Sequence, residues 1–144
     1  MNWEIILKRR EGYRLAFAGF DPNRVASYDE AKVEELMLDA GIIRNRRKIE
    51  SAINNAQRFL EVQREFGSFD VFFWGFVGGR TIQNNFKLIE EIPAITPEAE
   101  TMSKALVKLG FKFVGPTICY AIMQSAGLVN DHTVNCFRHD ELSK

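Results

Sequence analysis

The feature that most constrains the fold is a series of helical patterns that each end at a glycine. Apolar residues recur three or four positions apart before Gly41, Gly67, Gly110 and Gly127, as on the buried face of a helix. Glycine is common directly after a helix because it accepts the left-handed conformation of the C-terminal cap. No segment alternates apolar and polar residues for long enough to indicate a strand. The sequence therefore predicts an all-α fold, a helical bundle of several short helices.

Helix starts are marked as clearly as helix ends. Asp21 and Thr96 each precede a proline, and this order is typical of an N-cap followed by the first helical residue. Ser27-Tyr28-Asp29-Glu30 matches a capping box, so we expect it to open the helix that Gly41 ends. Ser68 is the expected cap of an apolar segment, which should be fully buried. Three further segments complete the prediction: one helix over 3–17, the buried segment 69–77 that follows Ser68, and a loop with one helical turn over 80–95.

Length and composition place these elements in one domain. A chain of 144 residues buries a sufficient core without disulfides, and it has two cysteines, Cys119 and Cys136. We therefore expect a single helical domain over 1–144, with Cys119 as a small core residue. Nineteen basic and nineteen acidic side chains exclude a globally basic nucleic-acid binder and leave room for a local basic surface.

No segment of the sequence predicts a membrane helix or a signal peptide. The longest apolar run, 71–77, is far shorter than the about 20 residues that a membrane helix needs. Near Met1 the positive charges follow the apolar residues, which is the reverse of a signal peptide. We expect a soluble, cytoplasmic protein that does not contact a membrane.

The most informative motif lies at 109–117. Gly110 ends one helix, and Gly115 precedes Pro116, the first residue expected in the next. The free N–H groups and the positive dipole end of that second helix suit a phosphate. This arrangement is typical of a helix-hairpin-helix motif, which binds the DNA backbone without reading the base sequence. An ordinary corner between two helices would show the same spacing.

Several segments, in one order along nearly the whole chain, resemble the DNA-3-methyladenine glycosylase I family of bacteria. The segments that carry the resemblance are 7–11 (LKRRE), 13–14 (YR), 20–22 (FDP), 39–44 (DAGIIR), 110–115 (GFKFVG), 117–120 (TICY) and 127–132 (GLVNDH). The resemblance implies a helix-hairpin-helix fold whose partner is double-stranded DNA with alkylated adenine. It implies a base-excision repair enzyme that flips out the damaged nucleotide and releases 3-methyladenine by hydrolysis. The expected location is the bacterial cytoplasm, in association with the nucleoid.

The resemblance also assigns roles to residues of this chain. Trp3 stands at the position of the tryptophan that stacks on the flipped base. Contacts to the DNA backbone are expected from the hairpin residues Gly110, Lys112, Gly115 and Thr117. Family members carry a structural zinc held by two cysteines and two histidines, and His132 and Cys136 match one such pair. Their spacing of four residues predicts that they share one face of a helix.

The chain departs from the family pattern at its N-terminal end. The family's first cysteine and histidine, a pocket tyrosine and the glutamate that recognises the base precede the position that corresponds to Met1. The zinc site is therefore expected to be incomplete, with two of four ligands, and His139 is a weak third candidate. The alternative function is a catalytically inactive, truncated helix-hairpin-helix module that still binds DNA. The surface left uncovered, with Trp3, Ile6 and Phe17 as candidates, predicts self-association.

Each of these residues also has a structural interpretation. Trp3 would then pack on the core, His132 would cap a helix and Cys136 would be a buried thiol. Asp131 is expected to cap a helix rather than to act as a catalyst. Two basic clusters are expected to be solvated helix surface or to face DNA phosphates: Lys8, Arg9 and Arg10 in one, and Arg44, Arg46, Arg47 and Lys48 in the other.

Overall fold

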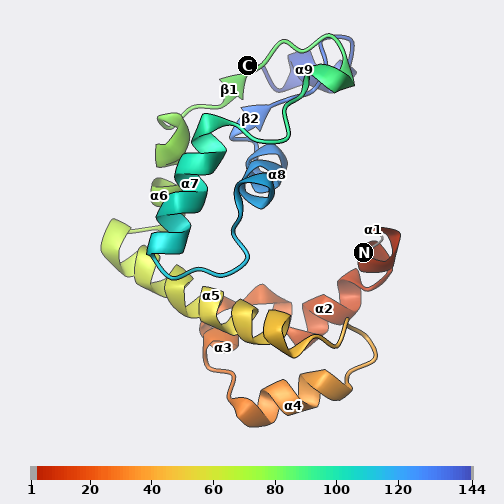
Figure 1. Cartoon of the computed structure of the whole chain (residues 1–144), viewed down its shortest axis with the longest axis vertical. Coiled ribbons are helices and arrows are strands. Elements are labelled where there is room, and N and C mark those ends of the chain that lie inside the picture. Colours follow the sequence, from red (N-terminus) through yellow and green to blue (C-terminus); the bar gives the residue numbers. More distant parts are fainter. Residues whose placement is uncertain (1–2, 144) are drawn as a thin grey trace. The chain divides into compact units, whose positions relative to one another are not determined.

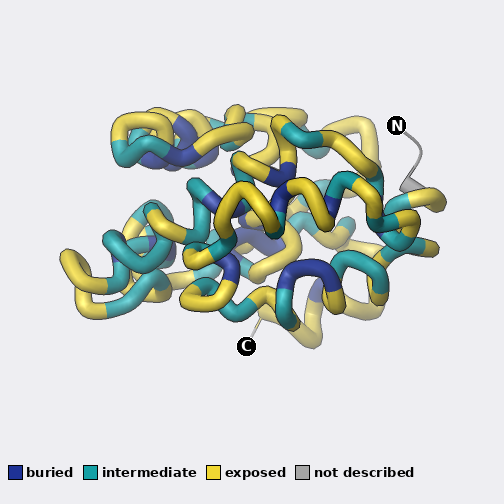
Figure 2. Tube along the Cα trace, turned by 90° about the horizontal axis from the view of Figure 1, so that it is seen from below, coloured by how far each residue is buried: buried dark blue, intermediate teal, exposed yellow. Residues whose placement is uncertain are grey.

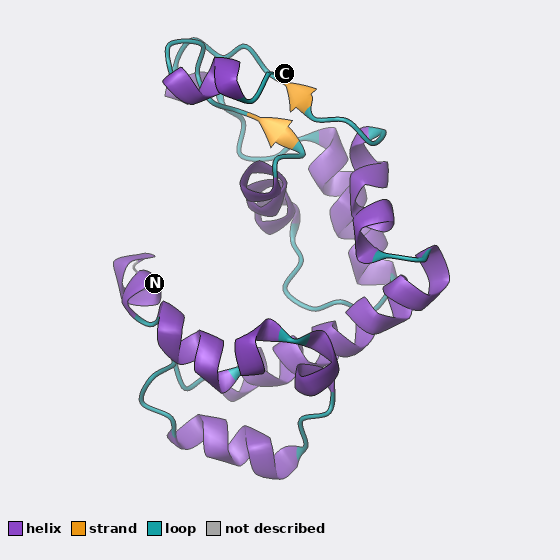
Figure 3. Cartoon of the chain, turned by 180° about the vertical axis from the view of Figure 1, so that it is seen from behind, coloured by secondary structure: helices purple, strands orange, loops and turns teal. Residues whose placement is uncertain are grey.

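The computed structural model describes residues 3–143, with only the backbone described for Trp3. Its residues pack into two compact units, of which one comprises 3–65 and 110–112 and the other comprises 66–109 and 113–143. Helices dominate both units, and the two short strands are the only ones within 3–143 (Figures 1 and 3). The prediction of an all-α fold is confirmed. Whether the whole chain acts as one domain stays a prediction.

The first unit contains five helices and one 3-10 turn in its described part. These elements are α1 (Trp3–Lys8), α2 (Arg10–Ala16), η1 (Ala18–Phe20), α3 (Pro22–Ala26), α4 (Glu30–Leu38) and α5 (Arg46–Phe66), whose last residue lies beyond the unit boundary. Its core is apolar and draws one or two residues from each of α2 to α5 and from the loops between them. The buried members are Ala16, Phe17, Val25, Val33, Leu36, Ile42, Ile49 and Ile53. Tyr28 closes this core, and its hydroxyl donates to the Ala16 carbonyl at 3.0 Å.

The second unit combines short helices with a small parallel sheet. Its elements are α6 (Phe69–Trp74), η2 (Gly75–Val77), β1 (Ile82–Gln83), η3 (Ile89–Glu91), α7 (Pro97–Lys108), α8 (Pro116–Ala126), β2 (Val129–Asn130) and α9 (Phe137–Glu141). Strand β1 pairs with β2 in the register Ile82 to Val129 and Gln83 to Asn130. Helices α7 and α8 pack on each other, and Met102 of α7 and Met123 of α8 are fully buried. The two-residue strands are too short to leave the alternating pattern that predicts a strand.

Several predicted starts and ends are confirmed. Asp21, Ser68 and Thr96 are the N-caps of α3, α6 and α7, and each side chain accepts a backbone N–H of the first turn. Gly127 follows α8 with a φ of 81°, in the left-handed region that favours glycine. Residues 80–95 form a loop with the single helical turn η3, as predicted, apart from β1.

Three local predictions are wrong. The N-cap of α4 is Asp29 rather than Ser27, because its carboxylate accepts Lys32 N–H at 2.9 Å, while Ser27 ends α3. The helix expected over 3–17 breaks at Arg9, whose side chain donates to the carbonyls of Ala40 at 2.5 Å and Ile42 at 2.9 Å. Helix α4 ends at Leu38, before Gly41, which instead lies against the backbone of Gly12.

The apolar segment 69–77 is less buried than the sequence predicts. Figure 2 shows that the buried positions of the chain form short stretches separated by exposed ones. Within 69–77, Phe73 alone is buried. Val71 is 62% exposed. The phenylalanines instead form a ladder of ring contacts, in which Phe72 lies 5.0 Å from Phe66 and 5.1 Å from Phe76 between ring centroids. A short helix buries one face, so the residues on its other faces stay accessible.

Candidate nucleic-acid interface

The second helix of the predicted hairpin begins with open backbone donors. Gly115 is the N-cap of α8 and has no side chain to cap it, and Pro116 occupies the first turn. The N–H groups of the first turn therefore lack the side-chain acceptor that a serine or aspartate cap would supply. Gly115 and Thr117 are exposed, and a Cβ added to Gly115 would meet nothing within 4 Å. This helix start is accessible to an anion from solvent.

The turn that precedes α8 contains two residues in the left-handed backbone region. Gly110 has a φ of 86°, and the Arg58 side chain fills the space on the side where a Cβ would point, at 3.3 Å. Phe113 has a φ of 56° although it is not glycine, and its side chain is half exposed. Such a conformation persists in a bulky residue only where the surroundings hold it. Lys112, between the two, is exposed, and its backbone contacts α5.

Val114, the residue before Gly115, is held by buried polar groups within the second unit. Ser103 of α7 is buried, and its hydroxyl donates to the Val114 carbonyl at 2.7 Å. Cys119 is also buried and its thiol donates to the same carbonyl at 3.4 Å, so it is the core residue that was predicted. Burial raises the pKa of the Cys119 thiol, which keeps it protonated. Sequence reasoning missed Ser103, because a serine inside a helix is not by itself a signal.

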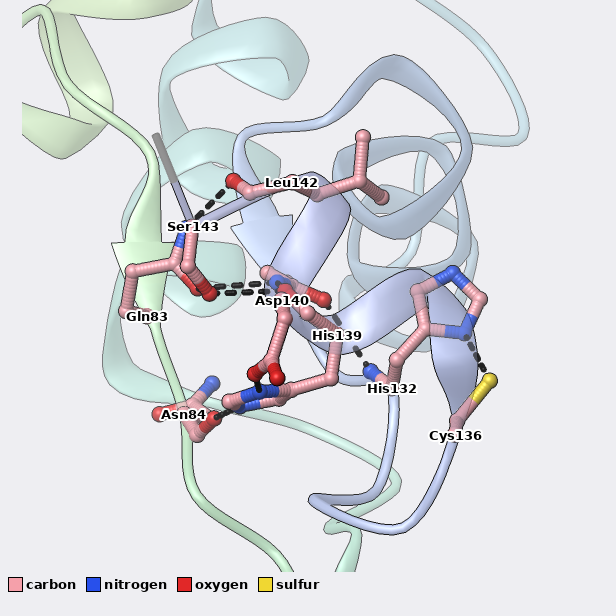
Figure 4. A network of polar contacts seen from close by, with 9 residues as sticks. Gln83, Asn84, His132, Cys136, His139, Asp140, Leu142 and Ser143 are labelled. Atoms are coloured by element: carbon pink, nitrogen blue, oxygen red, sulfur yellow. Dashed lines mark hydrogen bonds and ion pairs between the residues drawn. The ribbon is translucent and has the colours of Figure 1, made fainter.

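His132 and Cys136 lie close together, but they do not share a helix face. Figure 4 shows the pair, with Nδ1 of His132 3.5 Å from Sγ of Cys136. His132 lies in the loop after β2, and Cys136 is the N-cap of α9, so a turn rather than a helix brings them together. Zinc bonds of about 2.3 Å to sulfur and 2.0 Å to nitrogen place two tetrahedral ligands about 3.5 Å apart. The pair therefore fits one edge of a zinc site.

His139 does not complete that site. It is nearly buried, with Nε2 3.0 Å from the Asn84 carbonyl oxygen and Nδ1 3.1 Å from Oδ1 of Asp140 (Figure 4). The hydrogen bond to Asp140 and the one to the Asn84 carbonyl favour the protonated ring and raise the pKa of His139. Within residues 3–143, no group of three histidine, cysteine, aspartate or glutamate side chains is placed to hold a metal ion.

Asp131 is the centre of a polar network rather than a helix cap. Its carboxylate accepts from the Tyr120 hydroxyl at 2.5 Å, from Gln124 at 2.8 Å and from Asn84 at 2.7 Å. Burial and the neighbouring carboxylate raise the pKa of Tyr120, which keeps this donor protonated. Asp131 and His132 also line an open cavity of about 660 Å³ in the second unit, beside Trp74 and Ala121. The network joins α8 to the segment after β1, and no local sequence pattern predicts it.

Most of the predicted basic clusters are engaged within the chain. The Arg46 guanidinium pairs with Glu30 and Glu34, so it is not free for a phosphate. Arg9 donates to backbone carbonyls, as described above. Arg44, in the same predicted cluster as Arg46, is exposed. The side chain of Trp3, the predicted base-stacking residue, lies outside the described part of the structure, although its backbone begins α1.

These features define a helical protein whose two-helix hairpin, α7 and α8, presents an uncapped helix start at an accessible turn. The model of the methyladenine glycosylase family matches residues 1–139. The chain therefore belongs to the methyladenine glycosylase family.

Named relatives and solved structures agree with this assignment. DNA-3-methyladenine glycosylase 1 of Escherichia coli (strain K12) is 47% identical over 136 residues, which span 94% of this chain and 73% of that protein. A DNA-3-methyladenine glycosylase of Haemophilus influenzae is 40% identical over 94% of this chain and 74% of its own length. A crystal structure of 3-methyladenine DNA glycosylase I superposes with a TM-score of 0.90 at 45% identity, covering 96% of this chain and 76% of that one. The structure of 3-methyladenine DNA glycosylase I from Staphylococcus aureus, described as the structural basis of 3-methyladenine recognition, superposes with a TM-score of 0.91 at 32% identity. The match covers 95% of this chain and 73% of that one.

Among residues 3–143, no helix is long and apolar enough to cross a membrane.

Proposed function

We propose that this chain is a DNA-3-methyladenine glycosylase of base-excision repair. The family match over residues 1–139, together with relatives named for this activity, carries the proposal. The hairpin at 109–117 would act as a helix-hairpin-helix motif that holds double-stranded DNA. Gly110, Lys112, Gly115 and Thr117 would contact the backbone while the damaged nucleotide is flipped out. The cellular location would be the bacterial cytoplasm, at the nucleoid.

Cleavage of this glycosidic bond requires little acid catalysis from the protein. A 3-methylated adenine in DNA is cationic, so the bond between the sugar C1′ and the base nitrogen breaks with its electron pair moving to the base. The base leaves as neutral 3-methyladenine, while water supplies the hydroxyl that bonds to C1′ and releases one proton to the solvent. Aromatic stacking favours a cationic base in the pocket, and this is the role proposed for Trp3.

The test is release of 3-methyladenine from methylated duplex DNA by the purified 144-residue chain, followed by chromatography. Enzyme-dependent release of the free base is the expected result. Trp3→Ala should lower the rate of release while leaving DNA binding intact. Salt-dependent binding of DNA without any release would instead identify the alternative, a DNA-binding module without the chemistry.

We also propose that His132 and Cys136 are two ligands of a structural zinc ion. Their 3.5 Å separation supports this, and within residues 3–143 they are the two protein ligands of an incomplete site. The chain purified without chelator should carry zinc, measured by atomic absorption, and Cys136→Ser should remove it. A wild-type chain that takes up no zinc from a zinc-containing buffer would contradict the proposal.

Self-association is proposed through exposed apolar residues of α1. Ile5 and Leu7 are exposed, at 46% and 66%, which supports such a contact. Of the residues predicted to form the contact, Ile6 is half-buried. Phe17 is buried in the core of the first unit, so it is excluded from a self-association surface. Sedimentation equilibrium should detect a species larger than the monomer, which Leu7→Lys should dissociate. A sharp monomer at tens of micromolar would argue against self-association.

A further inference from the structure

Two adjacent asparagines of α5 hold the backbone of the hairpin turn. Asn55 forms a pair of hydrogen bonds with Lys112, because its Oδ1 accepts Lys112 N–H at 2.8 Å and its Nδ2 donates to the Lys112 carbonyl at 2.9 Å. Asn54 Nδ2 donates to the Gly110 carbonyl at 2.9 Å and to Asn55 Oδ1 at 3.1 Å. Residues 54 and 55 thus bond to both ends of the segment 110–112, which is 56 or 57 positions away in the sequence.

The Asn55 side-chain amide pairs with the backbone of this turn in the way that a neighbouring strand pairs with the edge of a sheet. Its planar group presents one donor and one acceptor side by side, which match the N–H and the carbonyl of a single residue. An aspartate would offer no donor to the Lys112 carbonyl, and an alanine would offer neither bond. The segment 110–112 has no helix or strand of its own, so its backbone groups need such partners.

The same segment is also held by packing at the two residues that precede Lys112. Phe111 is buried, and the Arg58 side chain fills the space beside Gly110, at 3.3 Å from the position of a Cβ. The Lys112 side chain itself is exposed. The turn therefore combines a fixed backbone with an accessible ammonium group. Such an arrangement holds the cation in a set position for contact with a phosphate.

We propose that Asn55, assisted by Asn54, is a positioning residue for DNA binding: it fixes the Lys112 backbone so that the lysine and the hairpin turn meet a DNA phosphate already ordered. This inference rests on the proposed function, because it presumes that the hairpin binds DNA. Ordering the turn before binding removes an entropic cost that a free loop would pay on contact with the phosphate. Neither asparagine touches the DNA in this account.

The test compares Asn55→Ala with Gln57→Ala, a matched control on the same helix. Gln57 also makes a side-chain bond to a distant backbone carbonyl, from Nε2 to Ala26 at 3.2 Å, but not to the hairpin. Affinity for undamaged duplex DNA is measured at several salt concentrations, together with thermal unfolding. We expect Asn55→Ala to weaken binding about 10-fold and to lower the salt slope by about one phosphate contact. Gln57→Ala should leave both unchanged.

A double-mutant cycle separates positioning from general stability. If Asn55 acts through Lys112, Asn55→Ala should have little further effect in a Lys112→Ala background. Asn54→Ala, which removes the bonds to Gly110 and to Asn55 but neither bond to Lys112, should weaken binding less than Asn55→Ala. Amide hydrogen exchange provides a readout without DNA, since Lys112 N–H should exchange faster in Asn55→Ala than in the wild type and be unchanged in Gln57→Ala.

The outcomes distinguish the inference from the function on which it rests. A wild-type chain without salt-dependent DNA binding would refute the proposed function and the positioning role together. Wild-type binding that Asn55→Ala leaves unchanged would refute the positioning role alone. Independent, multiplying effects of Asn55→Ala and Lys112→Ala would also overturn it, as would an equal loss of affinity in Gln57→Ala.

Discussion

Gly115→Asp is expected to abolish most DNA binding while leaving the protein folded. Gly115 has a φ of −63° and a ψ of 159°, which any residue adopts, and an added Cβ meets nothing within 4 Å. A carboxylate at this N-cap would bond to the open N–H groups of α8 and occupy the place proposed for a phosphate. Repulsion between like charges costs several kcal/mol, so we expect Kd to rise about 100-fold or more.

Stability should move in the opposite direction to binding. Aspartate is among the best N-cap residues and its charge complements the helix dipole, so the variant should be more stable by about 0.5–1 kcal/mol. Gly115→Asn is the matched control, because it has the same shape and capping ability without the charge. Duplex DNA affinity by fluorescence anisotropy and unfolding by denaturant measure the two effects. Binding by Gly115→Asp at the wild-type level would show that α8 does not face DNA through its N-terminus.

Gly12→Ala is expected to have the largest effect on stability. Gly12 lies within α2, and its Cβ would stand 2.2 Å from the carbonyl oxygen of Gly41 and 2.8 Å from the carbonyl carbon. Both atoms are backbone, and the loop that carries them is fixed from both sides. Arg9 donates to its carbonyls at 40 and 42, and Ile43 N–H donates to the Tyr13 hydroxyl at 3.2 Å.

Neither backbone can therefore move away cheaply. The free energy of unfolding should fall by about 3 kcal/mol, despite the better helix propensity of alanine. Thermal unfolding should move down by about 10 °C. Gly75→Ala is the control, since Gly75 has a right-handed helical backbone with open space around it, and it should gain about 0.5 kcal/mol. If the two variants were equally stable, the close approach of α2 to the loop after α4 would be wrong.

Helix starts are predictable from the sequence because their signals are local. Asp21, Ser68 and Thr96 cap helices through bonds to residues two or three positions away, which a sequence displays directly. The start of α4 is harder to predict from the sequence, because Ser27 and Asp29 are both good N-cap residues and lie within one turn of each other. The burial of 69–77 was overestimated because apolar composition does not say how many faces of a short helix are covered.

The candidate site was only partly predictable, because its contacts join distant parts of the chain. The motif at 109–117 indicated the hairpin, but the Asn55 bonds to Lys112 span 57 positions and leave no periodic trace. The sequence predicts a cap at Asp131, because aspartates near helices usually cap them, whereas the three donors to its carboxylate come from two separate segments. His132 and Cys136 meet through a turn and not on the helix face that their spacing predicts, because a separation of four residues does not distinguish the two.

The most direct test of the account is the rate of 3-methyladenine release from methylated duplex DNA under single-turnover conditions, over a range of protein concentrations. Wild-type protein and Gly115→Asp are compared in the same series. The account predicts that the wild type releases the free base and that Gly115→Asp needs a much higher protein concentration to reach the same maximal rate, because the hairpin binds DNA and takes no part in breaking the bond. No release by the wild type at any protein concentration would contradict the assignment of glycosylase activity to this chain.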